Sequence, residues 1–186
     1  AWGLLDAEAR QVLVGYPRQS PSAGITPLGN GGGFSGAALW RVEKVRERRE
    51  QLQIYLDKGR GDCHLRRRDI GQLVDAALRF HHGTWYELRA WVVMPNHLHV
   101  LFKITTTPMS KVVKEWKRYT SREVNRILAR TGLFWEEDYW DTYMRDEAHE
   151  LKSRSYIENN PVKAFLVRDP KDWPWSSARF REEYAR

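Results

Sequence analysis

Hydrophobic residues recur three and four positions apart in several stretches of the chain, the spacing of a helix that buries one face. Between residues 66 and 81 this pattern is clear and predicts a helix. Residues 110–130 and 146–159 predict two more, with Asp146 as the N-cap of the second and Pro161 as its stop. A thinner apolar stripe over residues 43–58 predicts a fourth helix, rich in charge.

Two shorter apolar runs, residues 85–93 and 97–104, predict strands joined by a tight passage at Met94-Pro95-Asn96. The order from residue 66 onward is therefore helix, strand, strand, helix and a further helix. A helix and a hairpin followed by a second helix form the core of an α+β, ferredoxin-like (RRM-like) antiparallel sheet with helices packed on it. Such a fold also requires a strand before the first helix.

Residues 1–42 differ from the rest of the chain. A short helix is possible over residues 6–16, and several prolines follow it. Residues 29–36 (GNGGGFSG) are a glycine-rich loop, and residues 38–42 have the composition of a strand. We therefore divide the chain into an atypical segment, residues 1–42, and a main domain, residues 43–186. If residues 37–42 supply the first strand the sheet is complete, and otherwise one edge is open.

Charge and cysteine content narrow the classes of function. The 186 residues carry a formal net charge of +7, with a sequence pI near 9.6. This excess favours a polyanionic partner, most commonly nucleic acid. Cys63 is the single cysteine, which excludes an intrachain disulfide or a cysteine-rich zinc site and is typical of the cytoplasm. The sequence shows neither a membrane-spanning run nor a signal peptide.

The pair His97 and His99 is the candidate site for chemistry. Residues two apart on a strand point to the same face, so both imidazoles face one point and can hold half of a metal site. Taken alone, a His-x-His pair more often decorates a solvated strand. Its neighbourhood decides between the two interpretations.

The predicted helix over residues 110–130 carries a second set of candidate residues. Tyr119 shares a face with Glu115, Arg122 and Glu123, which is unusual for a core tyrosine. The helix also carries several cations that suit phosphate contacts, although a solvated face would look similar. They are Lys111, Lys114, Lys117, Arg118, Arg122, Arg126 and Arg130.

Several stretches, in the same order, resemble the REP-associated tyrosine transposases, a group of single-tyrosine HUH transposases. The resemblance covers roughly residues 50–180. Its motifs are YLDKG at 55–59, LRRR at 65–68, VVMPNHLHVL at 92–101, WKRYT at 116–120, FW at 134–135, YMRDE at 143–147, YIENNPVKA at 156–164 and WPWSSAR at 173–179.

The resemblance implies an enzyme that cleaves and rejoins single-stranded DNA at palindromic hairpin repeats through a 5′-phosphotyrosine. It implies a divalent ion, Mg²⁺ or Mn²⁺, on His97 and His99, and Tyr119 as the nucleophile. The family often places a polar ligand, frequently an amide, one helical turn after the tyrosine, and here Glu123 holds that position. Lys114, Lys117, Arg118, Arg122 and Arg126 are then expected to bind DNA, in a monomer or a homodimer.

Other interpretations remain open. Glu123 can instead form a salt bridge with Arg126, and Tyr139 and Tyr143 are rival nucleophiles. The unusual N-terminal segment allows a catalytically inactive, hairpin-binding relic of a transposase. A nucleotide-binding module built on the glycine-rich loop is a third possibility, although the lysine and the catalytic loop of a kinase are missing.

Overall fold

A computed structural model describes residues 9–13, 44, 47, 50–52, 54–137 and 139–180 of the chain. Four strands form one sheet: β1 (Ala9–Leu13), β2 (Tyr86–Val93), β3 (Leu98–Ile104) and β4 (Trp140–Tyr143). Their order across the sheet is β2-β3-β1-β4, and every neighbouring pair is antiparallel. This arrangement confirms the predicted ferredoxin-like α+β fold. His99 lies on β3, a central strand, as predicted, and His97 immediately precedes that strand.

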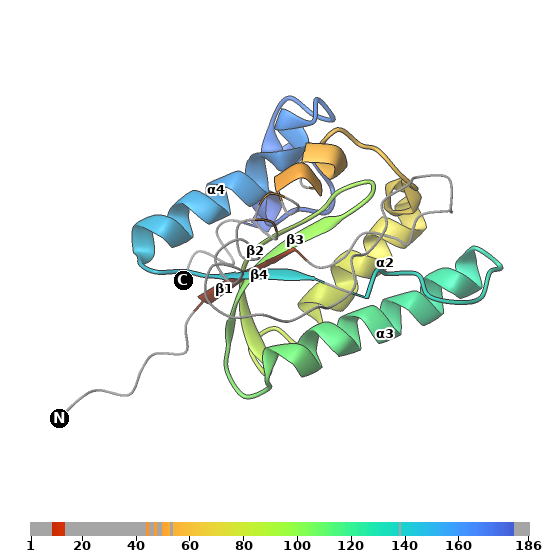
Figure 1. The fold of residues 1–186 in the computed structure, drawn as a ribbon, viewed down its shortest axis with the longest axis horizontal. Helices are drawn as coiled ribbons and strands as arrows, with labels where there is room; N and C mark the ends of the chain where they lie inside the picture. The colour runs from red at the N-terminus through yellow and green to blue at the C-terminus, as the bar shows by residue number, and fades with distance from the viewer. Residues whose placement is uncertain are drawn as a thin grey trace.

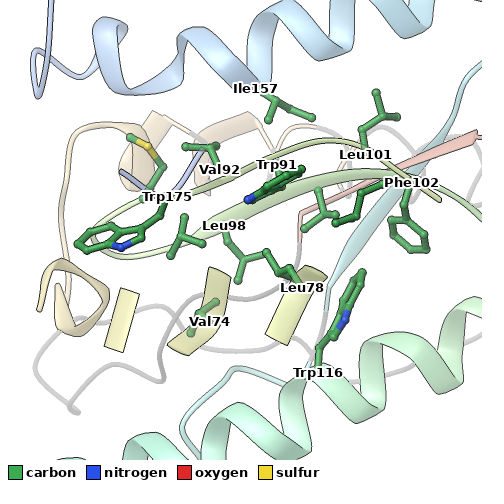
Figure 2. Close-up of a cluster of buried hydrophobic side chains, with 14 of the residues drawn as sticks. Val74, Leu78, Trp91, Val92, Leu98, Leu101, Phe102, Trp116, Ile157 and Trp175 are labelled. Carbon is green, nitrogen blue, oxygen red and sulfur yellow. The ribbon is translucent and has the colours of Figure 1, made fainter. Parts of the chain in front are cut away.

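Helices cover both faces of the sheet (Figure 1). On one face lie α2 (Arg68–Arg79) and α3 (Met109–Ile127), and on the other lies α4 (Glu147–Lys163). Residues of β3 alternate between the two layers: the ring centroid of Phe102 lies 5.2 Å from that of Trp116 on α3. Figure 2 shows Leu101 on the opposite side, beside Ile157 of α4. The side chains on one face of β3 therefore pack toward the layer of α2 and α3, and those on the other face pack toward α4.

The tail that follows α4 covers the outer edge of β2. Val93 donates its backbone N–H to the carbonyl of Trp175 over 2.9 Å, and the Trp173 indole donates to the Val93 carbonyl, also over 2.9 Å. The N–H of Trp91 donates to the hydroxyl of Ser177. These bonds satisfy backbone groups that an uncovered edge strand would leave unpaired.

The first strand differs from its prediction. A short helix over residues 6–16 was possible from the sequence, but residues 9–13 form β1, paired with both β3 and β4. Pairing with antiparallel strands on both sides outweighs the weak helical preference of these residues, because strand formation depends mainly on tertiary context. The alternative first strand at residues 37–42 and the glycine-rich loop lie outside the described residues. Part of the segment 1–42 therefore belongs to the same sheet as the main domain.

Two features beyond α3 also differ from the sequence pattern. The strand β4 was not predicted, because four residues of mixed polarity carry little periodicity. Asp146 does cap α4, accepting from the backbone N–H of His149 over 2.7 Å. Pro161, however, does not stop α4, which continues to Lys163. Proline interrupts a helix because it lacks a backbone N–H and because its ring clashes with the preceding turn. Here the proline lies within the last turn of α4.

The remaining helices and strands of the prediction are present. Helix α2 buries Ile70, Val74 and Leu78 at helical spacing, and residues between 44 and 57 include helical positions that end at Asp57. None of the helices in the described parts of the chain is both long and apolar enough to cross a membrane.

Gly71 on α2 gives a direct test of how the tail packs. A Cβ at this position would lie 2.7 Å from ring atoms of Trp175, far inside van der Waals contact. Ala normally stabilises a helix interior relative to Gly. We expect Gly71→Ala instead to lower the free energy of unfolding by about 1–3 kcal/mol, because the indole must move. Urea denaturation measures this, with the exposed Gln72→Ala on the same helix as control. A stabilised Gly71→Ala would contradict the packing.

Candidate metal and tyrosine site

The two histidines of the motif are fully buried and face one another. Relative exposure is 0% for His97 and 1% for His99, and their ring centroids lie 5.0 Å apart at an interplanar angle of 89°. His99 lies on β3 opposite Val92 of β2 and Leu13 of β1. A central strand paired on both sides therefore holds this histidine. The two rings are not on a solvated face, which rules out decoration of the surface.

Asn96, immediately before the motif, ties the histidines to the end of the preceding helix. Its buried carboxamide nitrogen donates to the carbonyl of Leu56 over 3.0 Å and to that of Arg60 over 2.7 Å. These two bonds orient the amide, since only its nitrogen can donate. They also hold residues 56–60, and with them Asp57, beside the histidines.

The fixed amide in turn sets the protonation of His97. Asn96 Oδ1 lies 2.8 Å from His97 Nδ1, so Nδ1 carries the proton and donates to it. Nε2 is then the nitrogen with a free lone pair. Burial, followed by the positive charge that His99 can carry, holds the pKa of His97 well below its usual value. His97 is therefore neutral at physiological pH, with its lone pair directed away from Asn96.

Asp57 completes a group of three possible ligands. Its Oδ1 lies 3.5 Å from His97 Nε2, and one atom each from Asp57, His97 and His99 lie within 4.8 Å of one another. Because His97 is neutral, the 3.5 Å contact places a lone pair opposite a carboxylate rather than forming an ion pair. Among the described residues, His97 Nε2 has no hydrogen-bond partner. Two imidazoles and a carboxylate with this arrangement fit a divalent cation.

Tyr156 on α4 is the tyrosine at this site. Its hydroxyl donates to Asp57 Oδ2 over 3.4 Å, and its ring centroid lies 5.5 Å from that of His99. Lys163 places its Nζ 4.6 Å from the centroid of the same ring. Buried Ile157 anchors the helix to the sheet, and the carboxylate of Glu158 accepts from the Ser177 hydroxyl over 3.0 Å. The phenol is therefore held between a carboxylate and a cation.

Tyr119 and Glu123 are not brought to the histidines. Both lie on α3, which packs on the opposite face of the sheet from α4 (Figure 1). Tyr119 is 41% exposed, with the guanidinium of Arg122 5.6 Å from its ring centroid. Glu123 accepts from Arg122 over 2.8 Å and lies 3.2 Å from Arg126 Nη2, and hydrogen bonding to Arg122 lowers its carboxyl pKa. The salt bridge that the sequence left open is therefore what the structure contains.

The basic residues predicted to contact DNA also lie on α3. Lys114, Arg118, Arg122 and Arg126 are exposed, and Arg118 is held by Glu115 through two bonds to Oε2 of 2.7 and 3.0 Å. Lys117 instead donates to the backbone carbonyls of Glu136 and Glu137 over 2.8 and 3.0 Å. Lys117 therefore anchors the loop before β4, while the others form a charged surface away from the histidines.

Asp57 and Tyr156 were missed as site residues from the sequence, although both lie in motifs that carry the family resemblance. Asn160 follows Tyr156 by four residues, so an amide stands one helical turn after this tyrosine. Its side chain is buried, and its Nδ2 has no hydrogen-bond partner among the described residues. The tyrosine-and-amide spacing of this motif was thus a signal in the sequence.

Comparison with known proteins gives consistent findings. Residues 68–160 match the family of IS200-like transposases. Two curated relatives bear the name REP-associated tyrosine transposase. One, from Haemophilus influenzae, is 27% identical over 103 residues, and the other, from Escherichia coli, is 29% identical over 104 residues. The matches take in 50% and 54% of this chain, and the chain spans 58% of the length of each relative.

A solved structure shares the fold. It is a REP-associated tyrosine transposase bound to a REP hairpin, and it superposes with a TM-score of 0.54 at 17% sequence identity. The likeness covers 100% of this chain and 84% of the other.

The buried, neutral His97 predicts a pH dependence of stability. An unfolded histidine titrates near 6.5, whereas the folded one resists protonation, so below about pH 6.5 the unfolded state binds more protons. Without added cation, we expect the free energy of unfolding to fall with decreasing pH there, by up to about 1.4 kcal/mol per pH unit from this group. Urea denaturation between pH 7.5 and 5 measures the slope. His97→Gln should flatten it, and His149→Gln is the control for loss of a histidine outside the site. An unchanged slope in His97→Gln would contradict the assignment.

Proposed function

We propose that this chain, which belongs to the IS200-like transposase family, cleaves and rejoins single-stranded DNA with Tyr156 as the nucleophile. The observation that carries this proposal is the contact of one tyrosine with both parts of the buried site. The phenol donates to Asp57, and its ring packs on His99.

In the proposed reaction the Tyr156 oxygen attacks a backbone phosphorus and forms a 5′-phosphotyrosine. The bond from phosphorus to the 3′ oxygen breaks, and that oxygen leaves as a 3′-hydroxyl after taking up a proton from water. Asp57 Oδ2, which already accepts the phenol hydrogen bond, orients the phenol for attack, and the phenol proton passes to water. Lys163 favours the phenolate by its charge over the ring. Attack by a 3′-hydroxyl on the phosphotyrosine reverses these steps and rejoins a strand.

His97, His99 and Asp57 would hold the divalent cation, Mg²⁺ or Mn²⁺. When bound, such an ion supplies Lewis-acid polarisation of the scissile phosphate and stabilises the leaving oxygen. Asn96 would keep His97 Nε2 available as a ligand by occupying Nδ1. Asn160, one turn after Tyr156 on the same helix face, is a candidate for a further ligand through its amide oxygen.

The hairpin substrate is supported by the family and by charge. A cationic surface suits the phosphate backbone, and the exposed Lys114, Arg118, Arg122 and Arg126 of α3 are candidates for such contacts. β1 fills the place of the first strand, so the sheet that carries His99 has a neighbour on both sides of β3.

Paired tyrosine variants test the nucleophile. We expect Tyr156→Phe to reduce the covalent protein–DNA adduct by at least about 10³-fold, because the attacking oxygen is lost. Tyr119→Phe is the matched control and should retain adduct formation. The assay incubates labelled hairpin DNA from repeats flanking the gene with Mn²⁺, followed by a denaturing gel. An adduct lost in Tyr119→Phe and kept in Tyr156→Phe would restore the sequence-based assignment. Hairpin binding without an adduct in the unmodified protein would favour the relic.

Paired carboxylate variants test the cation site without relying on activity. Mn²⁺ should raise the melting temperature of the protein, because a ligand that binds only the folded state stabilises it. We expect Asp57→Asn to raise the Mn²⁺ concentration needed for half of that shift by at least about tenfold. Glu123→Gln, which alters a carboxylate on the opposite face, should leave it unchanged. The reverse result would return Glu123 to the ligand set.

A further inference from the structure

Phe165 ends α4 in a conformation that usually belongs to glycine. The helix closes with two bonds, from the Phe165 N–H to the Val162 carbonyl over 3.0 Å and from the Leu166 N–H to the Pro161 carbonyl over 2.9 Å. This pair is the Schellman motif, in which the residue after the C-cap adopts the left-handed conformation. Phe165 is that residue, with φ of 56°.

A phenylalanine at this position opposes the local preference of the backbone. Glycine has no Cβ to clash in the left-handed region, whereas other residues are strained there, and glycine is the usual choice at this place in a Schellman motif. Burial of the phenyl group also contributes little to stability, because Phe165 is 95% exposed. Neither backbone geometry nor core packing therefore accounts for the side chain, and such an outlier is a reason to look for function.

Phe165 follows the C-cap of α4, the helix that carries the proposed nucleophile. Tyr156, Asn160 and Lys163 are spaced by four and three residues, so they share one face of α4 that leads to its C-terminal end. Lys163 contacts the ring of Tyr156, with its Nζ 4.6 Å from the centroid, and Phe165 follows two residues later. An exposed aromatic ring and a lysine thus both belong to the C-terminal end of the helix that carries the tyrosine.

We propose that Phe165 is a stacking platform for an unpaired base that flanks the phosphate attacked by Tyr156; this inference rests on the proposed function. Aromatic side chains bind single strands by stacking on successive bases, whatever the sequence, and neighbouring cations hold the phosphates. Phe165 supplies the π-face and Lys163 the cation. The ligand class is therefore an unpaired nucleobase in a single-stranded extension, not the paired stem of a hairpin.

The substitution Phe165→Gly separates this role from a structural one, because the two predict opposite changes. Relief of the left-handed strain should raise the melting temperature by a few degrees. Loss of stacking should weaken binding of a labelled hairpin with a single-stranded extension by about tenfold or more. Binding of the same hairpin without the extension should be unchanged. A lower melting temperature, or unchanged binding of the extended hairpin, would overturn the proposal.

Matched variants define the chemistry of the platform. Phe165→Trp should retain binding of the extended hairpin and Phe165→Leu should lose it, since leucine is apolar but has no π-face. Phe80→Leu is the control: Phe80 is 79% exposed but ends α2, on the other face of the sheet. An equal loss in Phe80→Leu, or retained binding in Phe165→Leu, would count against a specific platform.

Adduct formation separates failure of this inference from failure of the proposed function. With saturating extended hairpin, Phe165→Gly should still form the covalent adduct, whereas Tyr156→Phe should not. If the unmodified protein forms no adduct, the proposed cleavage fails, while the comparison of the two hairpins still judges the platform. If Phe165→Gly loses the adduct at saturation, Phe165 is not simply a stacking platform, and the inference is wrong.

Discussion

The pairing of β3 with partners on both sides is the constraint on which this structure depends. β2 and β1 fix β3 in the centre of the sheet, so its side chains can only alternate between two helix layers. Phe102 faces Trp116 of α3, and the ring of His99 packs against Tyr156 of α4. One face of β3 is thus given to apolar packing, and the other carries His99 beside the apolar contact of Leu101 with Ile157. A register shift of one residue would exchange the two.

Asn96 determines which nitrogen of His97 keeps a free lone pair. A buried carboxamide with both ends engaged has one orientation, and that orientation leaves Nε2 of His97 as the lone-pair nitrogen. The same amide holds the turn that follows Asp57, a residue distant in sequence. The ligand set is therefore assembled by hydrogen bonds to backbone carbonyls, which side-chain substitutions in the turn would not remove.

Helix α4 shows how a helix can be specified by its contacts more than by its own pattern. It buries polar residues, including Glu158 and Asn160, alongside Ile157, and it contains Pro161. The tail that follows returns to β2 and supplies Ser177 to Glu158, so the helix is held from both sides. The residue after its C-cap, Phe165, then adopts the left-handed conformation. The backbone strain at Phe165 is tolerated because contacts with the sheet and with the tail hold the rest of α4 in place.

Much of the fold followed from the sequence alone, for reasons of local periodicity. Helices α2 and α3 and the hairpin β2–β3 have long, regular patterns, and the spacing of His97 and His99 required a shared face. Short elements did not follow: β1 and β4 have few residues, and partners far along the chain decide their state. The choice between tyrosines was equally non-local. Tyr119 and Tyr156 both lie on predicted helices near charged residues, and both belong to motifs of the family. The sequence determined which reactive side chains are available: two histidines, acidic residues and tyrosines on predicted helices and strands. Only the tertiary structure decided that Asp57 and Tyr156 meet the histidines while Tyr119 and Glu123 face away, because the packing of α3 and α4 on opposite faces is set by the sheet.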